Sequence, residues 1–163
     1  MYNHEPKGYS CPFCKIVLGN EQGVHTKQAD IIYRDTYCTA FMASHPLPKT
    51  DGYIIVAPNQ HIEHLYDMSD KLLSKISLLS KKLAIVLKKE FKCGGINIRQ
   101  HNGPEYGQDI YHYHLHVIPR YKGDNIYHYV EHGTRRILKS EIRKKYALRL
   151  KKQFKKLYGV TTL

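Results

Sequence analysis

The sequence predicts an α+β fold: a single domain with a mainly antiparallel sheet, one long helix packed on the sheet and a basic C-terminal helix. Three observations carry this prediction. A length of 163 residues suits one hydrophobic core. Short runs of strand character lie on both sides of a long segment with helical apolar spacing. A segment dense in Lys and Arg then follows.

The first strands precede the long helix. Residues 31–33 and 38–41 flank Arg-Asp-Thr-Tyr, a pattern typical of a hairpin with a short turn. Residues 52–57 are rich in β-branched side chains and are followed by Pro58, which predicts a third strand that stops there.

The long helix shows a clear periodicity and has expected ends. Its apolar residues recur every three or four positions from Leu72 to Leu87. Ser69 is the expected N-cap because its hydroxyl can accept from a free backbone N–H of the first turn. Gly94 and Gly95 are the expected stop.

Two more strands should follow the helix. Residues 96–100 have strand character and lead into an Asn-Gly-Pro loop at residues 102–104. Histidines alternate with hydrophobic residues through residues 112–118. This alternation predicts a strand that ends at Pro119.

The positive charge is concentrated near the C-terminus. Residues 135–156 hold eleven Lys or Arg and one acid, Glu141, so this stretch carries +10 of the net charge of +12. It is either a solvated helix docked through an apolar face or a segment that binds anions, nucleic acid included. The first interpretation is favoured because apolar residues recur every four positions: Leu138, Ile142, Tyr146, Leu150, Phe154 and Tyr158.

Composition excludes several protein classes. No apolar run approaches the ~20 residues of a membrane span, and the N-terminus lacks a secretory pattern. The four cysteines are too few for a disulfide scaffold. We therefore expect a cytoplasmic protein without membrane contact, in which Cys38 and Cys93 are small buried hydrophobic residues.

Three histidines alternate along the last predicted strand. His112, His114 and His116 should share one face, because side chains two apart in a strand point the same way. Burying three imidazoles without partners is costly, so the pattern indicates function. They could bind a metal ion, most readily zinc, or one ring could attack phosphorus. Nearby donors at residues 102–104 and 107–109 favour a phosphate substrate.

A Cys-x-x-Cys motif lies near the N-terminus. Cys11 and Cys14 have the spacing that places two thiolates on one tetrahedral ion. The alternative is two unliganded thiols.

These motifs together resemble the histidine triad (HIT) family of nucleotide hydrolases and transferases, over roughly residues 10–125. His-Tyr-His-Leu-His-Val-Ile at residues 112–118 matches the family signature, with Gly-Gln before it and Pro-Arg after it. The Cys-Pro-Phe-Cys-Lys-Ile run from Cys11 and the Pro-x-x-His at 58–61 also match the zinc-containing subtype. The resemblance implies a HIT-like catalytic domain at residues 1–130, with residues 131–163 as a basic helical extension packed on it.

The resemblance also implies catalytic roles. His114 would attack the α-phosphorus of a nucleotide and form a covalent nucleotidyl-histidine, which water then cleaves. Its other ring nitrogen should donate to a fixed acceptor, for which a backbone carbonyl is expected. Asn102, Gln108 and His116 would position phosphate oxygens. His116 stands where the uridylyltransferase branch has glutamine, which favours hydrolysis over transfer.

Nucleotide recognition departs from the family in two places. Phe13, Ile16 and Phe41 match the positions that wall the nucleobase. Ala43 replaces the residue that often binds the ribose hydroxyls. Asp109 replaces a hydroxyl residue beside the phosphate, and we expect its carboxylate to turn to a backbone donor.

The resemblance implies one structural zinc ion. His61 and His112 would complete a site with Cys11 and Cys14, and four protein ligands leave no open position for catalysis. His64 is a lower-ranked alternative ligand.

Family members are commonly homodimers, joined through the sheet and the long helix. Two other functions stay open: a metalloenzyme in which the three strand histidines hold a catalytic ion, and a nucleotide- or nucleic-acid-binding module without catalysis. Nucleic-acid binding through the basic helix is possible but not expected.

Overall fold

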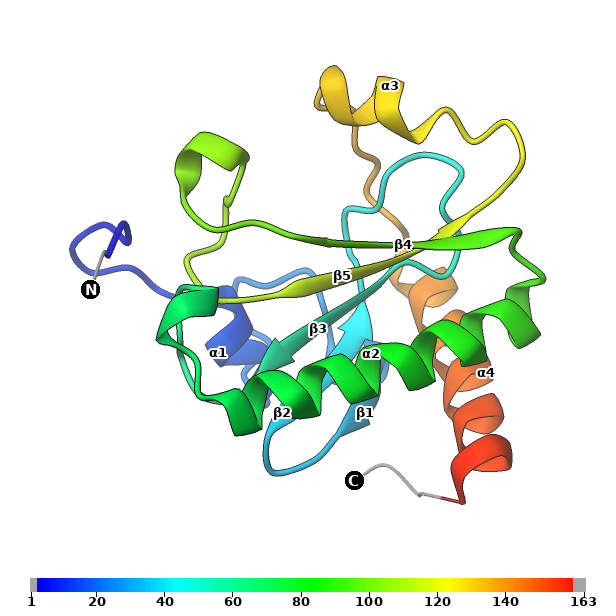
Figure 1. Ribbon diagram of the computed structural model, residues 1–163, viewed down its shortest axis with the longest axis horizontal. Coiled ribbons are helices and arrows are strands. Elements are labelled where there is room, and N and C mark those ends of the chain that lie inside the picture. Colours follow the sequence, from blue (N-terminus) through cyan, green and yellow to red (C-terminus); the bar gives the residue numbers. More distant parts are fainter. Residues whose placement is uncertain (1–2, 160–163) are drawn as a thin grey trace.

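The computed structural model describes residues 3–159 and contains one antiparallel sheet. Its strand order is β1-β2-β3-β5-β4 (Figure 1). The predicted fold class and the hairpin are confirmed. The strands are β1 (Ile31–Arg34), β2 (Cys38–Met42), β3 (Ile54–Pro58), β4 (Gly95–Gln100) and β5 (Leu115–Arg120).

The helices and 3₁₀ turns connect these strands. They are α1 (Pro12–Val17), η1 (Gln28–Asp30), η2 (Leu65–Asp67), α2 (Asp70–Phe91), η3 (Pro104–Tyr106), α3 (Ile126–Glu131) and α4 (Ser140–Tyr158). No helix within residues 3–159 is both long enough and apolar enough to cross a bilayer.

The long helix α2 begins as predicted and ends earlier than predicted. The Ser69 hydroxyl accepts a hydrogen bond from the Leu72 amide at 3.3 Å, which confirms the N-cap. The predicted stop at Gly94 and Gly95 is wrong. Lys92 takes the left-handed conformation at φ 54° and ends the helix, and Gly95 already belongs to β4.

The histidine strand begins later than predicted, at Leu115, and ends later, at Arg120. β5 begins at Leu115, so His112 and His114 lie in the segment just before it. That segment is fixed to a loop instead of the ladder, because the Tyr113 amide donates to the Ile62 carbonyl at 2.6 Å. Pro119 lies inside β5, where it is tolerated because pairing with β3 ends at Val117.

The two faces of the sheet pack against different elements. One face carries alternate side chains of β2, β3 and β5, among them Met42, Val56 and Val117, which form the main core with α2 and α4. The opposite face carries Phe41, Ala57 and their neighbours, which pack on α1. His116 lies on this second face, opposite Ile55 of β3.

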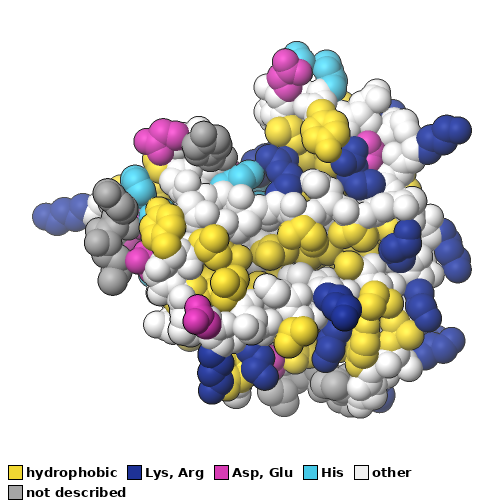
Figure 2. All heavy atoms as spheres, viewed as in Figure 1, with side chains coloured by type: hydrophobic (Ala, Val, Ile, Leu, Met, Phe, Trp, Pro, Cys, Tyr) yellow, Lys and Arg dark blue, Asp and Glu magenta, His cyan; other side chains and the backbone are white. Residues whose placement is uncertain are grey.

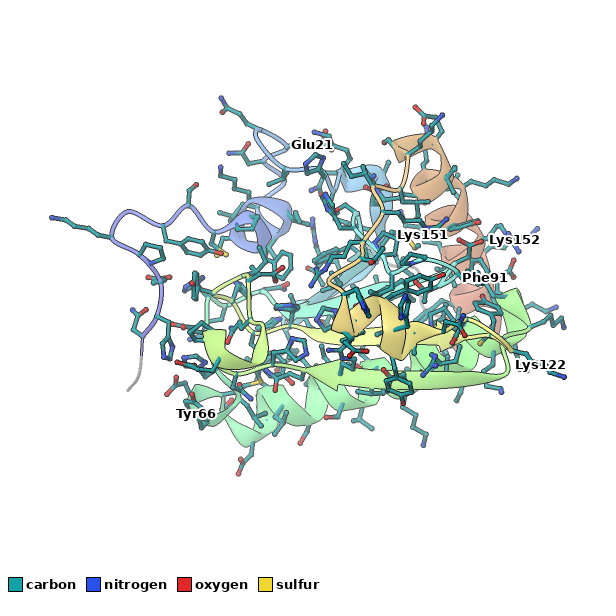
Figure 3. All side chains as sticks on the ribbon, turned by 90° about the horizontal axis from the view of Figure 1, so that it is seen from above. Glu21, Tyr66, Phe91, Lys122, Lys151 and Lys152 are labelled. Atoms are coloured by element: carbon teal, nitrogen blue, oxygen red, sulfur yellow. The ribbon has the colours of Figure 1, made fainter. Side chains whose placement is uncertain are left out.

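The basic helix α4 packs against α2, η1 and β1. Figures 1 and 3 place it at the end of the molecule opposite the N-terminal segment, where Phe91 of α2 packs edge-to-face on Tyr146. The predicted face is partly wrong. A spacing of four drifts from the true period of 3.6, so Ile142 is 37% exposed. The residues that α4 buries are Arg143, Ala147, Leu150 and Phe154.

The division of the chain at residue 130 stays a prediction.

Candidate functional site

A cavity of about 370 Å³ opens on the sheet face that α2 and α4 leave uncovered. His114 and His116 form its floor with Tyr53 and Ile55, Phe13 and Ile16 of α1 form one wall, and Arg135 reaches it from the chain that leads to α4. The histidines, the nucleobase-wall positions and the basic segment therefore meet in one place.

His114 is held in one tautomer. Its Nδ1 donates to the carbonyl oxygen of His112 at 2.8 Å, so the lone pair of the neutral ring is on Nε2. The ring is only 4% exposed, and burial lowers the pKa of His114, an effect that this hydrogen bond and Asp109 partly oppose. The backbone carbonyl expected for this role is the one two residues earlier in the chain.

His116 lies beside it, with ring centroids 4.7 Å apart. The Tyr53 hydroxyl is 2.8 Å from His116 Nδ1. Burial, followed by the neighbouring His114 and His101, holds the pKa of His116 well below its ordinary value, while burial raises the pKa of Tyr53 to about 12. The phenol therefore keeps its proton, and where it donates to Nδ1 the ring proton of His116 is on Nε2.

The two predicted amide donors are held by the protein itself. Gln108 Oε1 accepts from the Gly103 amide at 2.7 Å, and its Nε2 donates to the Glu63 carbonyl at 3.0 Å. Asn102 Nδ2 donates to Gln100 Oε1 at 2.8 Å. Neither Gln108 nor Asn102 is among the residues that line the cavity. Their role as phosphate donors stays a prediction, which requires these loops to rearrange when substrate binds.

Asp109 does line the cavity, and the expectation that it turns to a backbone donor is wrong. Its carboxylate lies 3.4 Å from the Arg135 guanidinium, and both side chains are about half exposed. This pairing depends on the tertiary fold, because Arg135 comes from a part of the chain that sequence spacing cannot place near Asp109. The charge density of residues 135–156 was the available signal for Arg135.

The nucleobase-wall positions divide into two layers. Phe13 and Ile16 line the cavity, whereas Phe41 is fully buried and supports Phe13 from behind, at 5.3 Å between ring centroids. On the other wall, Ser44 and His45 follow Ala43 along the cavity.

A second group of ligand-type side chains adjoins the triad. Cys11, Cys14, His61 and His112 each offer one atom, and these atoms all lie within 4.8 Å of one another. Cys11 Sγ lies 3.3 Å and Cys14 Sγ 3.6 Å from His112 Nδ1, and Cys14 Sγ lies 3.2 Å from His61 Nδ1. Two thiols and two imidazoles are a donor set that suits tetrahedral zinc.

The outer nitrogens of both imidazoles are engaged, as metal-bound histidines require. His112 Nε2 donates to the Pro58 carbonyl at 3.0 Å, which leaves the Nδ1 lone pair directed at the thiols. His61 Nε2 lies 3.1 Å from a carboxylate oxygen of Glu5. In both rings the nitrogen that faces the thiols is therefore the one with a free lone pair, as a metal ligand needs.

His64 does not join the cysteines. It lies instead with His4 and Glu63, where its Nε2 is 3.1 Å from Glu63 Oε1 and 3.1 Å from His4 Nδ1. Across residues 3–159, these are the two places where three or more possible ligands converge, and neither contains His114 or His116. The geometry therefore disfavours one ion held by all three triad histidines.

Comparison with known proteins agrees with these features. The HIT domain family model matches residues 24–123. The chain is 35% identical over 116 residues to Protein hit of Bacillus subtilis, covering 71% of this chain and 74% of the relative. An uncharacterized HIT-like protein of Borreliella burgdorferi is 38% identical over 118 residues, covering 71% and 79%.

Solved structures give the same result. A HIT family protein from Bacillus subtilis aligns with a TM-score of 0.61 at 32% identity, over 71% of this chain and 77% of that one. A Zn-bound histidine triad family protein from Mycobacterium smegmatis aligns with a TM-score of 0.73 at 24% identity, over 92% and 96%, and at this identity supports the fold alone.

Proposed function

The chain belongs to the HIT family, and from that membership and the geometry of the cavity we propose that it is a nucleotide phosphohydrolase acting through a covalent nucleotidyl-histidine. One observation carries the proposal: His114 Nδ1 donates to the His112 carbonyl, so the lone pair of a buried neutral ring is on Nε2 beside the cavity. An imidazole whose only proton is fixed in this way is ready to attack phosphorus.

The chemistry balances in two steps. The Nε2 lone pair of His114 forms a bond to the α-phosphorus, and the bond from phosphorus to the leaving group breaks with its electron pair on the leaving group. Water then attacks the same phosphorus and loses a proton to the solvent or the departed leaving group, the N–P bond breaks, and the electron pair returns to Nε2. The His112 carbonyl stabilises the positive ring formed in the first step, because it accepts from Nδ1 throughout.

Other residues position the substrate. His116, with its proton on Nε2, donates to a phosphate oxygen, and Tyr53 holds that ring in place. Phe13 and Ile16 offer a flat apolar wall to the nucleobase. Gln108 and Asn102 contribute as phosphate donors after loop rearrangement.

We infer further that Cys11, Cys14, His61 and His112 hold one structural zinc ion. The donor set and the tautomers described above support this assignment. These four residues would hold the ion, which would tie α1 to the segment that carries His114 and, with four protein ligands, would take no part in the reaction.

We also expect a cytoplasmic homodimer joined through the sheet and α2. β4 is an edge strand, and Figure 2 shows hydrophobic side chains gathered over β4 and α2. Ile98 on β4 is 49% exposed and Leu78 on α2 is 57% exposed. Light scattering after gel filtration tests the dimer, because a mass of one chain would contradict it.

Trapping the intermediate tests the enzymatic proposal. Protein is mixed with an α-phosphorus-labelled nucleotide substrate and quenched in alkali, because a P–N bond is labile in acid. We expect label on the wild-type chain at His114, no label on His114→Ala, and normal labelling of His128→Ala, a change of one exposed histidine outside the cavity.

The outcomes separate the alternatives. Activity that survives His114→Ala, with no trapped label, would reject the covalent mechanism. Activity lost on chelation and restored by metal without refolding would favour the metalloenzyme. Salt-dependent RNA or DNA binding that survives His114→Ala, without turnover, would favour a binding module.

A further inference from the structure

A second, smaller cavity of about 70 Å³ adjoins the first across His116. His45, Tyr53, His116 and Arg135 line both cavities, so the two are neighbours beside the triad. By the same measure a single water needs only about 10–15 Å³, so there is room for a phosphate group. We call this cavity the arginine pocket, because Arg99 and Arg135 both line it.

The arginine pocket is positive on every side that carries charge. The charged groups are Arg99 and Arg135, and no carboxylate is among the lining residues. Burial lowers the pKa of His45 and His101, so these two imidazoles are neutral near pH 7. The nearest acid that contacts them is Asp109, which faces the larger cavity and lies 3.4 Å from Arg135. The two guanidinium groups therefore favour an anion in this pocket over an ammonium ion.

Strand pairing fixes Arg99 beside the triad. Arg99 of β4 is the register partner of His116 of β5, so both side chains lie on the same face of the sheet. Arg99 Nη2 donates to His101 Nε2 at 3.0 Å, and the His101 ring lies 5.7 Å from the His116 ring. These contacts hold a partly buried guanidinium next to His116, the ring proposed above to donate to the substrate phosphate.

From this arrangement we propose that the arginine pocket binds the anionic leaving group of the substrate, so that the enzyme prefers phosphoanhydrides of nucleotides to phosphoramidates of amines. The inference rests on the proposed function and narrows its substrate class. When His114 bonds to the α-phosphorus, the bridging P–O bond breaks and its electron pair stays on the departing phosphate. The arginines stabilise that developing charge. An amine that departs from a nitrogen already protonated leaves as a neutral molecule and gains nothing from them.

The test compares two substrates that share one nucleoside monophosphate: a dinucleoside triphosphate and a phosphoramidate of a primary amine. Wild-type kcat/KM should be at least tenfold higher for the triphosphate. Arg99→Gln should lower kcat/KM for the triphosphate by about 10- to 100-fold, the range for loss of a charge-assisted contact, and should leave the phosphoramidate value within about threefold.

Lys122→Gln is the matched control. It removes one positive charge from an exposed loop residue that lines neither cavity (Figure 3). It should leave both substrates unchanged, which separates a local contact from general attraction of anions. Far-UV circular dichroism confirms that each variant is folded.

Two results would overturn the inference. Equal losses on both substrates would mean that Arg99 acts on His116 and not on the leaving group, and no loss on the triphosphate would mean that the pocket is not used. If wild type hydrolyses neither substrate, the proposed function fails instead. Calorimetry with inorganic tripolyphosphate then decides on the pocket alone: weaker binding to Arg99→Gln supports it, and equal or no binding rejects it.

Discussion

Arg143 of α4 is a buried cation whose removal should destabilise the whole fold. It is 3% exposed, and its Nε donates to Asp30 Oδ2 at 2.8 Å while Nη2 donates to the His25 carbonyl at 2.6 Å. It also donates to the Leu138 carbonyl. Arg143→Met keeps most of the side-chain volume and removes all of these hydrogen bonds.

The expected loss is set by the carboxylate left behind. Asp30 is fully buried, and one of its oxygens has no partner even with Arg143 present. Breaking a buried ion pair by removing one partner costs about 3–5 kcal/mol in free energy of unfolding, mostly because a charge stays buried and unpaired. Adding Asp30→Asn to Arg143→Met should therefore recover about 1–3 kcal/mol, since a neutral amide is cheaper to bury.

Urea denaturation followed by far-UV circular dichroism measures both changes, because the chain has no tryptophan to report by fluorescence. With a urea dependence of about 2 kcal/mol per molar, Arg143→Met should lower the midpoint by about 1.5–2.5 M. A loss below about 1 kcal/mol would refute the buried-charge reasoning. So would a double variant less stable than Arg143→Met alone.

Three further predictions follow from the site and its surroundings. Hydrogen bonds from Arg120 lower the pKa of Asp124 to about 2, so the stabilisation by its carboxylate is lost as the pH falls from 4 to 2. Asp124→Asn should therefore reduce the free energy of unfolding by about 1–2 kcal/mol above pH 4 and change it little near pH 2. A constant difference in unfolding free energy across this range would contradict it. Cys11→Ser should abolish the stoichiometric zinc that mass spectrometry measures and should lower the melting temperature. The control Cys38→Ala should keep the metal. Wild-type protein without zinc would reject the site. Tyr53→Phe should lower kcat about 10- to 100-fold in steady-state assays by freeing the His116 ring, and an unchanged kcat would exclude that role.

Periodicity predicted the elements well, because local spacing determines them. The strands and α2 follow from β-branched runs and from apolar residues at helical spacing, and the hydroxyl of Ser69 marked the helix start. Ends were harder to predict. Lys92 adopts a left-handed conformation that favours glycine. In α4 the helical period of 3.6 residues differs from the apolar spacing of four, so Ile142 is exposed.

The site could be predicted only where residues are close in the sequence or match a family motif. The spacing of Cys11 and Cys14 indicated a metal pair, and the resemblance supplied two histidines that the fold brings to them. Tyr53, Arg99 and Arg135 carry no local signal, because strand register and the docking of the C-terminal segment bring them to His116.

The role of His112 is divided between its side chain and its main chain. The ring faces Cys11 and Cys14, while the carbonyl oxygen of the same residue orients the His114 ring. A substitution at this position removes the ring from the thiols, whereas the carbonyl that accepts from His114 belongs to the main chain and is present in every amino acid. Loss of the imidazole ligand therefore leaves in the chain the acceptor that sets the tautomer of the nucleophile.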